Sequence, residues 1–277
     1  MAKRDTNDSE PRGYGETDTA VLTAATSQAP AAAQAQPLCV VPLGRGTRGK
    51  TWWVRWAVGR ALAQGRELVI ADADRTNATL SAFFDRVVTP PSADETDMRD
   101  WFAAFIERQI TDRFTALIDL GGGDLILKQL AREIGLAGFL ERYGISPVAV
   151  HLLGPDLDDL AYLRDLEQDA LFAPAATILV LNEALVARGR SEKTAFQSTI
   201  LDHPVFLKAL DRGAKVVWMP RLTVAHEIDA RRLSFTAAEE SRVKPGQTPI
   251  GPWNRQLIHN WLRDMETNFA PVAHWLP

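Results

Sequence analysis

The sequence predicts an α/β fold of three layers, in which helices cover both faces of a mostly parallel, twisted sheet. From Leu38 onward, short apolar runs alternate with amphipathic segments, which is typical of strand–helix crossover units. The apolar runs lack the polar–apolar alternation of a half-exposed strand, and this favours strands buried on both sides. A glycine-rich segment joins the first run to the first amphipathic segment, where parallel α/β folds often bind phosphate.

The alternation defines each element in turn. Six short runs rich in aliphatic and β-branched residues are predicted strands: 38–43, 67–71, 114–120, 147–153, 176–181 and 215–219. The segments between them with helical periodicity are predicted helices: 51–63, 95–109, 124–142, 156–170 and 203–212.

The two ends of the chain differ from this region. Residues 1–36 are rich in small and polar residues and cannot bury enough apolar surface to offset the entropy of ordering, so we expect a disordered tail, with a partner-binding arm as the alternative. Residues 37–245 form the predicted main domain. Residues 246–277 form a predicted Trp-rich helical extension that packs on it through an apolar stripe: Leu257, Ile258, Trp261, Leu262, Met265 and Phe269.

Composition limits the classes of function. The net charge of −4 and the pI near 5.8 argue against a generally basic nucleic-acid binder. A small basic cluster remains, at Arg188, Arg190 and Lys193, which is either a solvated loop or a site of non-specific DNA contact. The single cysteine, Cys39, lies in the first predicted strand and cannot form an internal disulfide, which fits a buried thiol and a cytoplasmic location.

Membrane insertion is not expected. No apolar run approaches the length of a membrane span, and the N-terminus lacks the apolar core of a signal peptide. The helical stretch near 255–269 lacks the Lys/Arg-rich polar face of a membrane-surface helix, so docking on protein is favoured.

The most specific motif is G-R-G-T-R-G-K-T at residues 44–51, which fits the phosphate-loop pattern G-x-x-x-x-G-K-[ST]. Glycines allow several N–H groups to turn toward one anion, and the following helix adds partial positive charge. Lys50 is expected to reach the β- and γ-phosphates and Thr51 to ligate Mg²⁺. The alternative is a turn that binds nothing. The predicted cofactor-binding residues of the loop are Gly44, Gly46, Thr47, Arg48, Gly49, Lys50 and Thr51.

Two carboxylates follow the second predicted strand, at the edge where open α/β sheets bind ligands. Asp72 and Asp74 are spaced so that they can reach Mg²⁺ or orient a water near a γ-phosphate. The alternative is a solvated loop in which Thr76 or Asn77 caps the next helix.

A third carboxylate, Asp119, lies at the end of the third predicted strand, where it is expected to hold Mg²⁺, commonly through water. The glycines at 121–123 permit close approach of the backbone to a phosphate, and Asp124 is a predicted helix N-cap. A glycine-rich turn without a ligand is the alternative.

Asn182 leaves the fifth predicted strand. Its amide can pair with the edge of adenine as donor and acceptor together. The chain has no Asn-x-x-Asp segment of the kind that binds guanine, so adenine is the predicted base.

The order, spacing and content of these segments resemble the ParA/MinD family of deviant-Walker P-loop ATPases, over residues 38–220. The stretch 72–79 is similar to the family's switch I segment. Within the family, the chain resembles plasmid conjugal-transfer proteins of the TraL type. That finer resemblance is carried by Leu181-Asn182-Glu183, Arg188-Gly189-Arg190, Met219-Pro220 and the R-L-S-F-T-A-A stretch at 232–238.

The resemblance implies a P-loop NTPase fold and a role for each matching residue. Asp74 would position or activate the attacking water, while Asp72 and Asp119 would support Mg²⁺. Asn182, with backbone near Pro220, would hold adenine. The implied catalytic residues are Lys50, Asp74 and Arg45, and the implied metal ligands are Thr51, Asp72 and Asp119.

The chain departs from the family pattern within the loop. The family carries a signature lysine at the second loop position, which reaches across a dimer to the partner's nucleotide, and this chain has Arg45 there. Thr47 and Arg48 also replace smaller residues. Arginine keeps the positive charge but not the geometry of lysine. Contact across a dimer is therefore open, and hydrolysis is expected to be slow or lost.

The predicted function is a cytoplasmic ATPase that binds Mg-ATP, hydrolyses it slowly, and switches between monomer and homodimer in plasmid conjugal transfer, mobilisation or partition. Its expected partners are plasmid transfer or partition proteins. One alternative is a nucleotide-binding scaffold with negligible turnover that recruits a relaxase or coupling protein. Another is an ATP-dependent small-molecule synthetase of the dethiobiotin-synthetase type.

Overall fold

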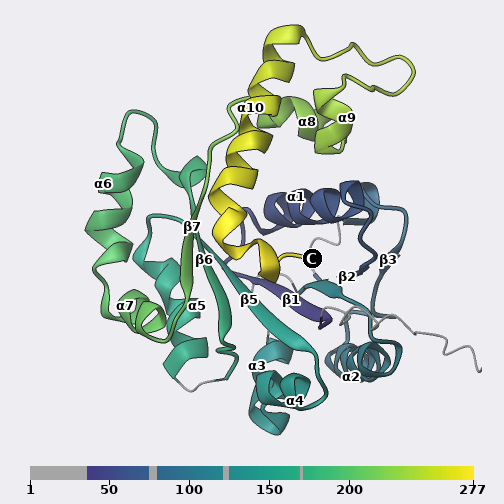
Figure 1. Cartoon of the computed structure of the whole chain (residues 1–277), viewed down its shortest axis with the longest axis vertical. Helices are drawn as coiled ribbons and strands as arrows, with labels where there is room; N and C mark the ends of the chain where they lie inside the picture. Colours follow the sequence, from purple (N-terminus) through teal and green to yellow (C-terminus); the bar gives the residue numbers. More distant parts are fainter. Residues whose placement is uncertain (1–35, 75–79, 121–124, 169–170) are drawn as a thin grey trace, which may run out of the picture. The chain divides into compact units, whose positions relative to one another are not determined.

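Seven parallel strands form the centre of the fold. The computed structural model describes residues 36–74, 80–120, 125–168 and 171–277, and these belong to one compact unit. The strand order is β3-β2-β4-β1-β5-β6-β7, and every pairing between the described strands is parallel (Figure 1). The predicted α/β fold of three layers with a parallel sheet is therefore confirmed.

The strands are β1 (Leu38–Leu43), β2 (Val69–Asp72), β3 (Val87–Val88), β4 (Ala116–Asp119), β5 (Ser146–Leu153), β6 (Ala176–Asn182) and β7 (Lys215–Met219). The α-helices are α1 (Lys50–Ala63), α2 (Glu95–Asp112), α3 (Leu125–Ile134), α4 (Leu136–Arg142), α5 (Leu157–Gln168), α6 (Glu192–Phe196), α7 (Pro204–Asp211), α8 (Ala225–Arg231), α9 (Phe235–Glu239) and α10 (Pro252–Phe269). Short 3₁₀ segments, η1 (Leu80–Ala82), η2 (Glu183–Leu185) and η4 (Ala270–Trp275), and a π-helical turn, η3 (Gln197–Leu201), complete the described elements.

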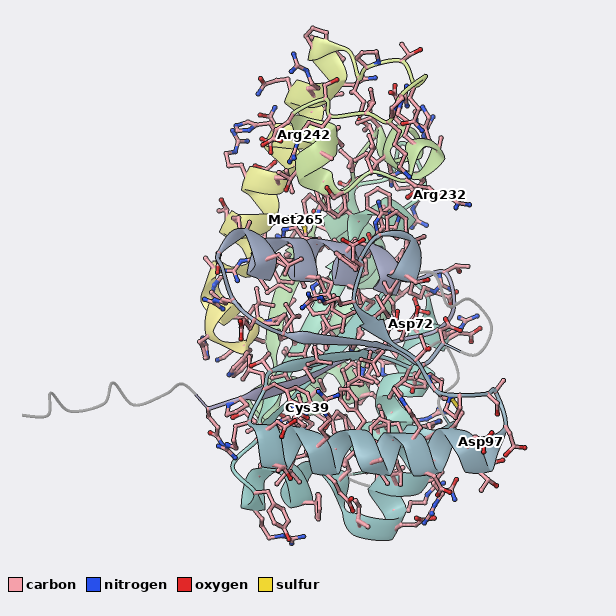
Figure 2. The ribbon with its side chains drawn as sticks, turned by 90° about the vertical axis from the view of Figure 1, so that its right-hand side faces the viewer. Cys39, Asp72, Asp97, Arg232, Arg242 and Met265 are labelled. Carbon is pink, nitrogen blue, oxygen red and sulfur yellow. The ribbon has the colours of Figure 1, made fainter. Side chains whose placement is uncertain are left out.

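Helices cover the two faces of the sheet with separate apolar cores. On one face, Val40 and Val150 pack with Trp53 of α1 and Met265 of α10. The other face carries two apolar clusters. In one, residues of β1 and β4 pack against α2, α3, α4 and α5. In the other, residues of β6 pack against α5, α6 and α7. In Figure 2 the sheet is seen between α1 above it and α2, which carries Asp97, below it. Each large side chain buried in this way contributes about 1.5–3 kcal/mol.

The junction between α3 and α4 differs from the sequence-based prediction. The segment predicted as a single helix over 124–142 forms two helices, because Gly135 adopts φ 61 between α3 and α4. That left-handed conformation suits glycine and ends the first helix. Residue 124 lies outside the described part of the chain.

The end of the second predicted strand differs from the prediction at a candidate site residue. The predicted strand 67–71 is β2, which ends at Asp72, and the predicted strand 114–120 is β4, which ends at Asp119. Asp72 therefore belongs to a strand end rather than to the loop that follows, and Asp119 lies at a strand end as predicted. The two-residue β3 and the short helices α6, α8 and α9 were not predicted, because elements of this length carry too little pattern to detect.

The C-terminal helix α10 begins at Pro252, where the missing N–H of proline costs no helical bond. The stripe residues Ile258, Trp261, Met265 and Phe269 are buried, and Leu257 and Leu262 pack partly buried against the same core. Asn268 Nδ2 donates to the Trp218 carbonyl of β7 at 2.9 Å. Among the described residues, we find no helix with the length and hydropathy that crossing a membrane requires.

Cys39 is buried in β1. Burial raises the pKa of its thiol to about 12, so the group is a neutral thiol at physiological pH. Its packing, rather than its reactivity, accounts for its place in the core.

Candidate functional site

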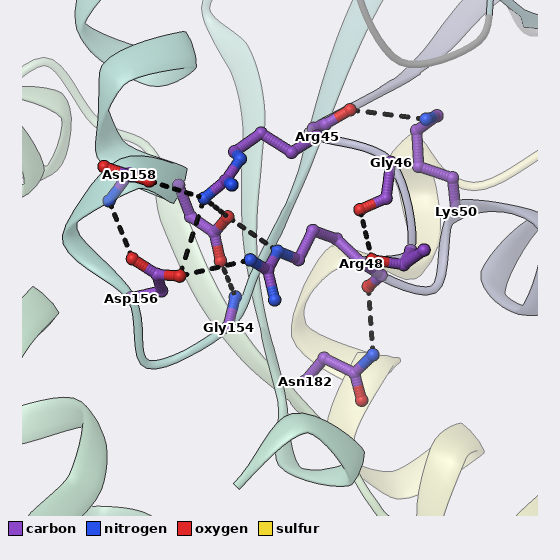
Figure 3. A network of polar contacts seen from close by, with 11 residues as sticks. Arg45, Gly46, Arg48, Lys50, Gly154, Asp156, Asp158 and Asn182 are labelled. Carbon is purple, nitrogen blue, oxygen red and sulfur yellow. Dashed lines mark hydrogen bonds and ion pairs between the residues drawn. The ribbon is translucent and has the colours of Figure 1, made fainter.

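The segment 44–51 forms a tight loop between β1 and α1. Gly44 follows β1 directly with φ 141, and a Cβ placed there would lie 2.7 Å from the Leu152 carbonyl oxygen of β5. Only glycine therefore allows the chain to leave the sheet so close to β5. Lys50 Nζ donates to the Gly44 carbonyl at 3.3 Å, which closes the loop on itself (Figure 3).

Helix α1 begins at this loop with its N-terminus uncapped by a side chain. Its N-cap is Gly49, with φ 91, which supplies no side-chain acceptor for the first N–H groups of the helix. Those groups carry partial positive charge. Lys50 is the first residue of α1 and is 7% exposed, while Thr51 is half-buried beside it. The loop therefore places backbone donors, an ammonium and a hydroxyl within one short segment.

Asn182, at the end of β6, supports the loop from the side. Its Nδ2 donates to the Arg48 carbonyl at 3.0 Å, and its Oδ1 accepts from the Ala184 N–H at 3.0 Å. A Cβ at Gly49 would lie 2.5 Å from Asn182 Nδ2, so the two residues are in close contact. One of the two N–H groups of the Asn182 amide donates to the loop, and the amide oxygen keeps a second lone pair.

The two loop arginines pair with carboxylates that follow β5, here called the α5 carboxylates: Asp156, Asp158 and Asp159 (Figure 3). Arg45 Nη1 lies 3.3–3.5 Å from an oxygen of each of the three. Arg48 Nε lies 2.7 Å from Asp159 Oδ1, and its Nη2 donates to Asp156 Oδ2 at 3.2 Å. Both guanidinium groups are therefore held on the side of the loop that faces β5 and α5.

Asp159 is the buried member of this network. Its side chain is 1% exposed, against 75% for Asp158. Burial raises the pKa of Asp159, while the 2.7 Å bond from the Gly154 N–H to its Oδ2 and the charges of Arg48 and Arg45 act in the opposite direction. A buried carboxylate of this kind depends on its hydrogen-bond and ionic partners.

Asp72 and Asp119 lie side by side at the same edge of the sheet as the loop. They are paired across β2 and β4 as Cα partners, and they are 2% and 3% exposed. Asp72 Oδ1 accepts from the Asp74 N–H at 3.2 Å and Oδ2 accepts from the Leu80 N–H at 3.0 Å. Asp74 is half-buried beside them. Figure 2 shows Asp72 at this edge of the sheet.

These groups fit the way proteins hold Mg²⁺, through one or two carboxylates together with substrate phosphates. Asp119 and Asp72 supply two buried carboxylates, and Thr51 supplies a hydroxyl from the adjacent loop. No cluster of three or more His, Cys, Asp or Glu side chains suited to a metal occurs in the described ranges. A metal here would accordingly depend on ligands from a bound phosphate group.

A cavity of about 190 Å³ lies directly beside the loop. Its lining includes Thr47 and Gly49 of the loop, Asn182 and Pro220 from the ends of β6 and β7, and Trp261 of α10. The volume is below the roughly 300–1,000 Å³ of pockets that take a whole drug-sized ligand. It has room for one ring system attached to a group bound by the loop.

The structure thus brings most of the predicted residues together. The loop, Asn182 and Pro220 surround the cavity, and Asp72, Asp74 and Asp119 form a second group at the same sheet edge. Arg45 lies apart from the cavity, on the α5 carboxylates. The predictions for Thr76 and Asn77, for the glycines at 121–123 and for Asp124 concern residues outside the described part of the chain.

Two features of the site were not predicted. The first feature is the α5 carboxylates, which follow the carboxyl end of β5. Open α/β sheets bind ligands at this edge, and Asp72 and Asp119 were predicted as site residues on the same ground. The sequence predicts Trp261 only as part of the apolar stripe of α10. Its polar role depends on tertiary packing, for which the sequence carries no local signal.

Comparison with known proteins gives only distant likenesses. No protein-family model matches the chain, and no curated protein matches it. The MinD cell division protein of Aquifex aeolicus is 12% identical, with a TM-score of 0.44 over 83% of this chain and 97% of that one. The signal recognition particle receptor FtsY of Elizabethkingia anophelis is 11% identical, with a TM-score of 0.43 over 82% of this chain.

A third likeness is to the chloroplast FtsY of Physcomitrella patens, which is 14% identical with a TM-score of 0.42 over 82% of this chain. The chain spans 65% of the length of either FtsY structure. Likenesses at this level of identity concern the fold alone.

Proposed function

We propose that this chain binds Mg-ATP at the loop 44–51 and hydrolyses it slowly. The observation that carries the proposal is the geometry of the β1–α1 junction. Gly49 begins α1 in a left-handed conformation, and the buried Lys50 closes on the Gly44 carbonyl. A phosphate group would exchange with that carbonyl as the partner of the ammonium and would accept from the loop N–H groups.

The other residues have complementary roles in the proposal. Thr51, Asp72 and Asp119 hold Mg²⁺, which when bound neutralises charge on the phosphates. The base occupies the cavity beside the loop, where Asn182 Oδ1 and the Pro220 carbonyl each keep one lone pair for a donor. Two acceptor oxygens suit the amino group of adenine, because that group offers two N–H donors.

Asp74 is the group proposed to orient the attacking water. Asp74 follows β2, and its N–H donates to Asp72 at 3.2 Å. The residue proposed to orient water and the residue proposed to bind Mg²⁺ are therefore held together. Positioned acid–base groups contribute about 10²–10⁴-fold in rate. With Arg45 engaged by the α5 carboxylates, slow turnover is the expected state of the free chain.

At the level of biology, we propose a ParA/MinD-like switch between monomer and homodimer that serves plasmid conjugal transfer, mobilisation or partition. The sequence resemblance over 38–220 supports it, as does the cation at Arg45. Arg188, Arg190 and Lys193 are all exposed, which non-specific DNA contact requires. The plasmid transfer or partition machinery would supply the protein partners.

A nucleotide-binding scaffold with negligible turnover is the second candidate. It is favoured by the three carboxylates that hold Arg45 within its own chain, since a cation so engaged contributes nothing to a transition state. Turnover measured with and without candidate partners separates the two. Absence of turnover in both conditions supports the scaffold.

Isothermal titration calorimetry with MgATP tests nucleotide binding. We expect wild type to bind and Lys50→Ala to lose at least about tenfold in affinity, because an ion–phosphate bond contributes about 1.5–3 kcal/mol. Lys215→Ala, which removes an exposed lysine at the opposite end of the sheet, is the matched control and should bind as wild type. Equal affinity in Lys50→Ala and wild type would refute the assignment of the loop.

A further inference from the structure

The C-terminal helix α10 reaches the cavity beside the loop through one side chain. Trp261 Nε1 donates to the Pro220 carbonyl at 2.7 Å, and both residues line the cavity. Trp261 is 4% exposed, so its indole ring is buried in the protein. Asn268, two turns further along α10, donates to the Trp218 carbonyl at 2.9 Å. The helix therefore holds two alternate carbonyls at the end of β7.

Neighbouring aromatic rings fix the orientation of this indole. The Phe235 ring centroid of α9 lies 4.8 Å from that of Trp261, and the Trp52 centroid of α1 lies 6.3 Å away at 88°. Trp52 and Phe235 are themselves 5.2 Å apart. Tilted and edge-to-face contacts of this kind favour one ring geometry. The indole N–H is consequently a fixed donor to Pro220.

Several polar groups that line the cavity each make at least one hydrogen bond within the chain. Asn182 Nδ2 is bonded to the Arg48 carbonyl, and the Ala184 N–H is bonded to Asn182 Oδ1. The Thr47 hydroxyl donates to the Gly46 carbonyl at 2.6 Å. Asn182 Oδ1 and the Pro220 carbonyl oxygen each accept one hydrogen bond and have a lone pair for a second. Both oxygens are therefore available as acceptors for a ligand.

We propose that Trp261 is a positioning residue for the base of the nucleotide. By occupying one lone pair of the Pro220 carbonyl, it fixes that oxygen so that the remaining lone pair takes a donor from a 6-amino purine. A 6-oxo purine offers an oxygen at that position and one ring N–H beside it, so it fills the two acceptors less well. The inference rests on the proposed nucleotide binding, and it makes α10 part of base selection.

The test compares MgATP with MgITP, which differ at position 6 of the purine. We expect wild type to bind MgATP about tenfold more tightly than MgITP, because the loss of one hydrogen bond of about 1.4 kcal/mol lowers affinity about tenfold. Trp261→Phe keeps a ring and removes the donor, and the ratio should fall by about threefold to tenfold. Trp253→Phe makes the same change on the same helix at a residue 78% exposed, and the ratio should not change.

If Trp261→Phe does not fold, an NMR measurement on wild type alone still tests the proposal. The indole ¹⁵N–¹H signal of Trp261, assigned through bonds, should shift on addition of MgATP and much less with MgITP, because the amino group shares the same acceptor. An unchanged signal with saturating MgATP overturns the proposal.

The outcomes separate the two levels of inference. If wild type binds neither nucleotide, the proposed function fails and the role of Trp261 fails with it. If wild type binds both nucleotides equally, or if Trp261→Phe keeps the wild-type ratio, nucleotide binding stands and the positioning role is wrong.

Discussion

Arg48 Nε lies 2.7 Å from Asp159 Oδ1, which ties the loop before α1 to the first turn of α5. The same carboxylate accepts from the Gly154 N–H through its other oxygen. One buried side chain therefore fixes both the loop between β1 and α1 and the end of β5. The position of the candidate site depends on this contact as well as on the glycines of the loop.

Removing Asp159 should destabilise the fold. Asp159→Ala removes the acceptor of the Gly154 N–H and the ion-pair partner of Arg48 Nε, while Arg48 Nη2 keeps its bond to Asp156. Hydrogen bonds to charged groups contribute about 1.5–3 kcal/mol. We expect the free energy of unfolding in urea to fall by about that amount. Asp158→Ala, at a side chain 75% exposed, is the control and should change it by less than about 0.5 kcal/mol. Equal losses in both variants would show that burial at Asp159 is unimportant.

Arg45 should take part in an ATP-dependent dimer only after it leaves the α5 carboxylates. With MgATP or a slowly hydrolysed analogue, we expect the mass of wild type by light scattering to double, because an arginine–phosphate contact from which water is excluded is strong. Arg45→Ala should remain monomeric, and Arg45→Lys should dimerise if charge alone is needed. The same mass for wild type and Arg45→Ala in every condition would limit Arg45 to its own chain.

Asp74 should affect turnover without affecting binding. Asp74→Ala is expected to lower the rate of phosphate release by about 10²–10⁴-fold, since it removes the group proposed to orient water, while calorimetry should give near wild-type affinity for MgATP. Asp85→Ala removes an exposed carboxylate from the same region and is the matched control. Wild-type turnover in Asp74→Ala would assign the catalytic role to another residue.

His151 should make stability depend on pH. It is buried on β5 beside Leu43, and burial, with a smaller contribution from Arg212, lowers its pKa to about 3 from an ordinary value near 6.5. Between these values the unfolded chain binds a proton that the folded chain does not, so the free energy of unfolding falls as pH decreases. The expected slope from this group is about 1.4 kcal/mol per pH unit.

Urea unfolding of wild type and His151→Leu at several values between pH 7 and 5 isolates this contribution. The variant should lose stability less steeply than wild type on acidification, whatever its stability at pH 7. Parallel curves would mean that His151 is accessible to protons in the folded state.

The strand–helix alternation predicted the sheet well because buried parallel strands have a strong apolar pattern. All six predicted strands exist, with β1 and β7 at the predicted residues. The sequence predicts one helix through Gly135, because a single glycine inside a helical pattern is tolerated. Its left-handed φ is a property of the tertiary fold, and so the break between α3 and α4 was missed.

The sequence predicts the phosphate loop of the candidate site but not the contacts that the loop makes with distant residues. Residues of the loop follow a fixed spacing, which a sequence displays directly. The contact between Gly49 and Asn182, by contrast, joins residues from β6 and the start of α1, and the hydrogen bond from Trp261 to Pro220 joins α10 to β7. Contacts of such sequence separation depend on how the helices pack, which local patterns do not encode.

The dependence of the cavity on Trp261 has a consequence for synthesis of the chain. Trp261 is made more than two hundred residues after the loop residue Gly49. At roughly 5–20 residues per second, a ribosome takes about 10–40 s to cover that interval. Throughout it, the cavity beside the loop lacks the wall that Trp261 supplies and Trp52 lacks this aromatic partner, so the proposed nucleotide site is completed only after α10 has been made.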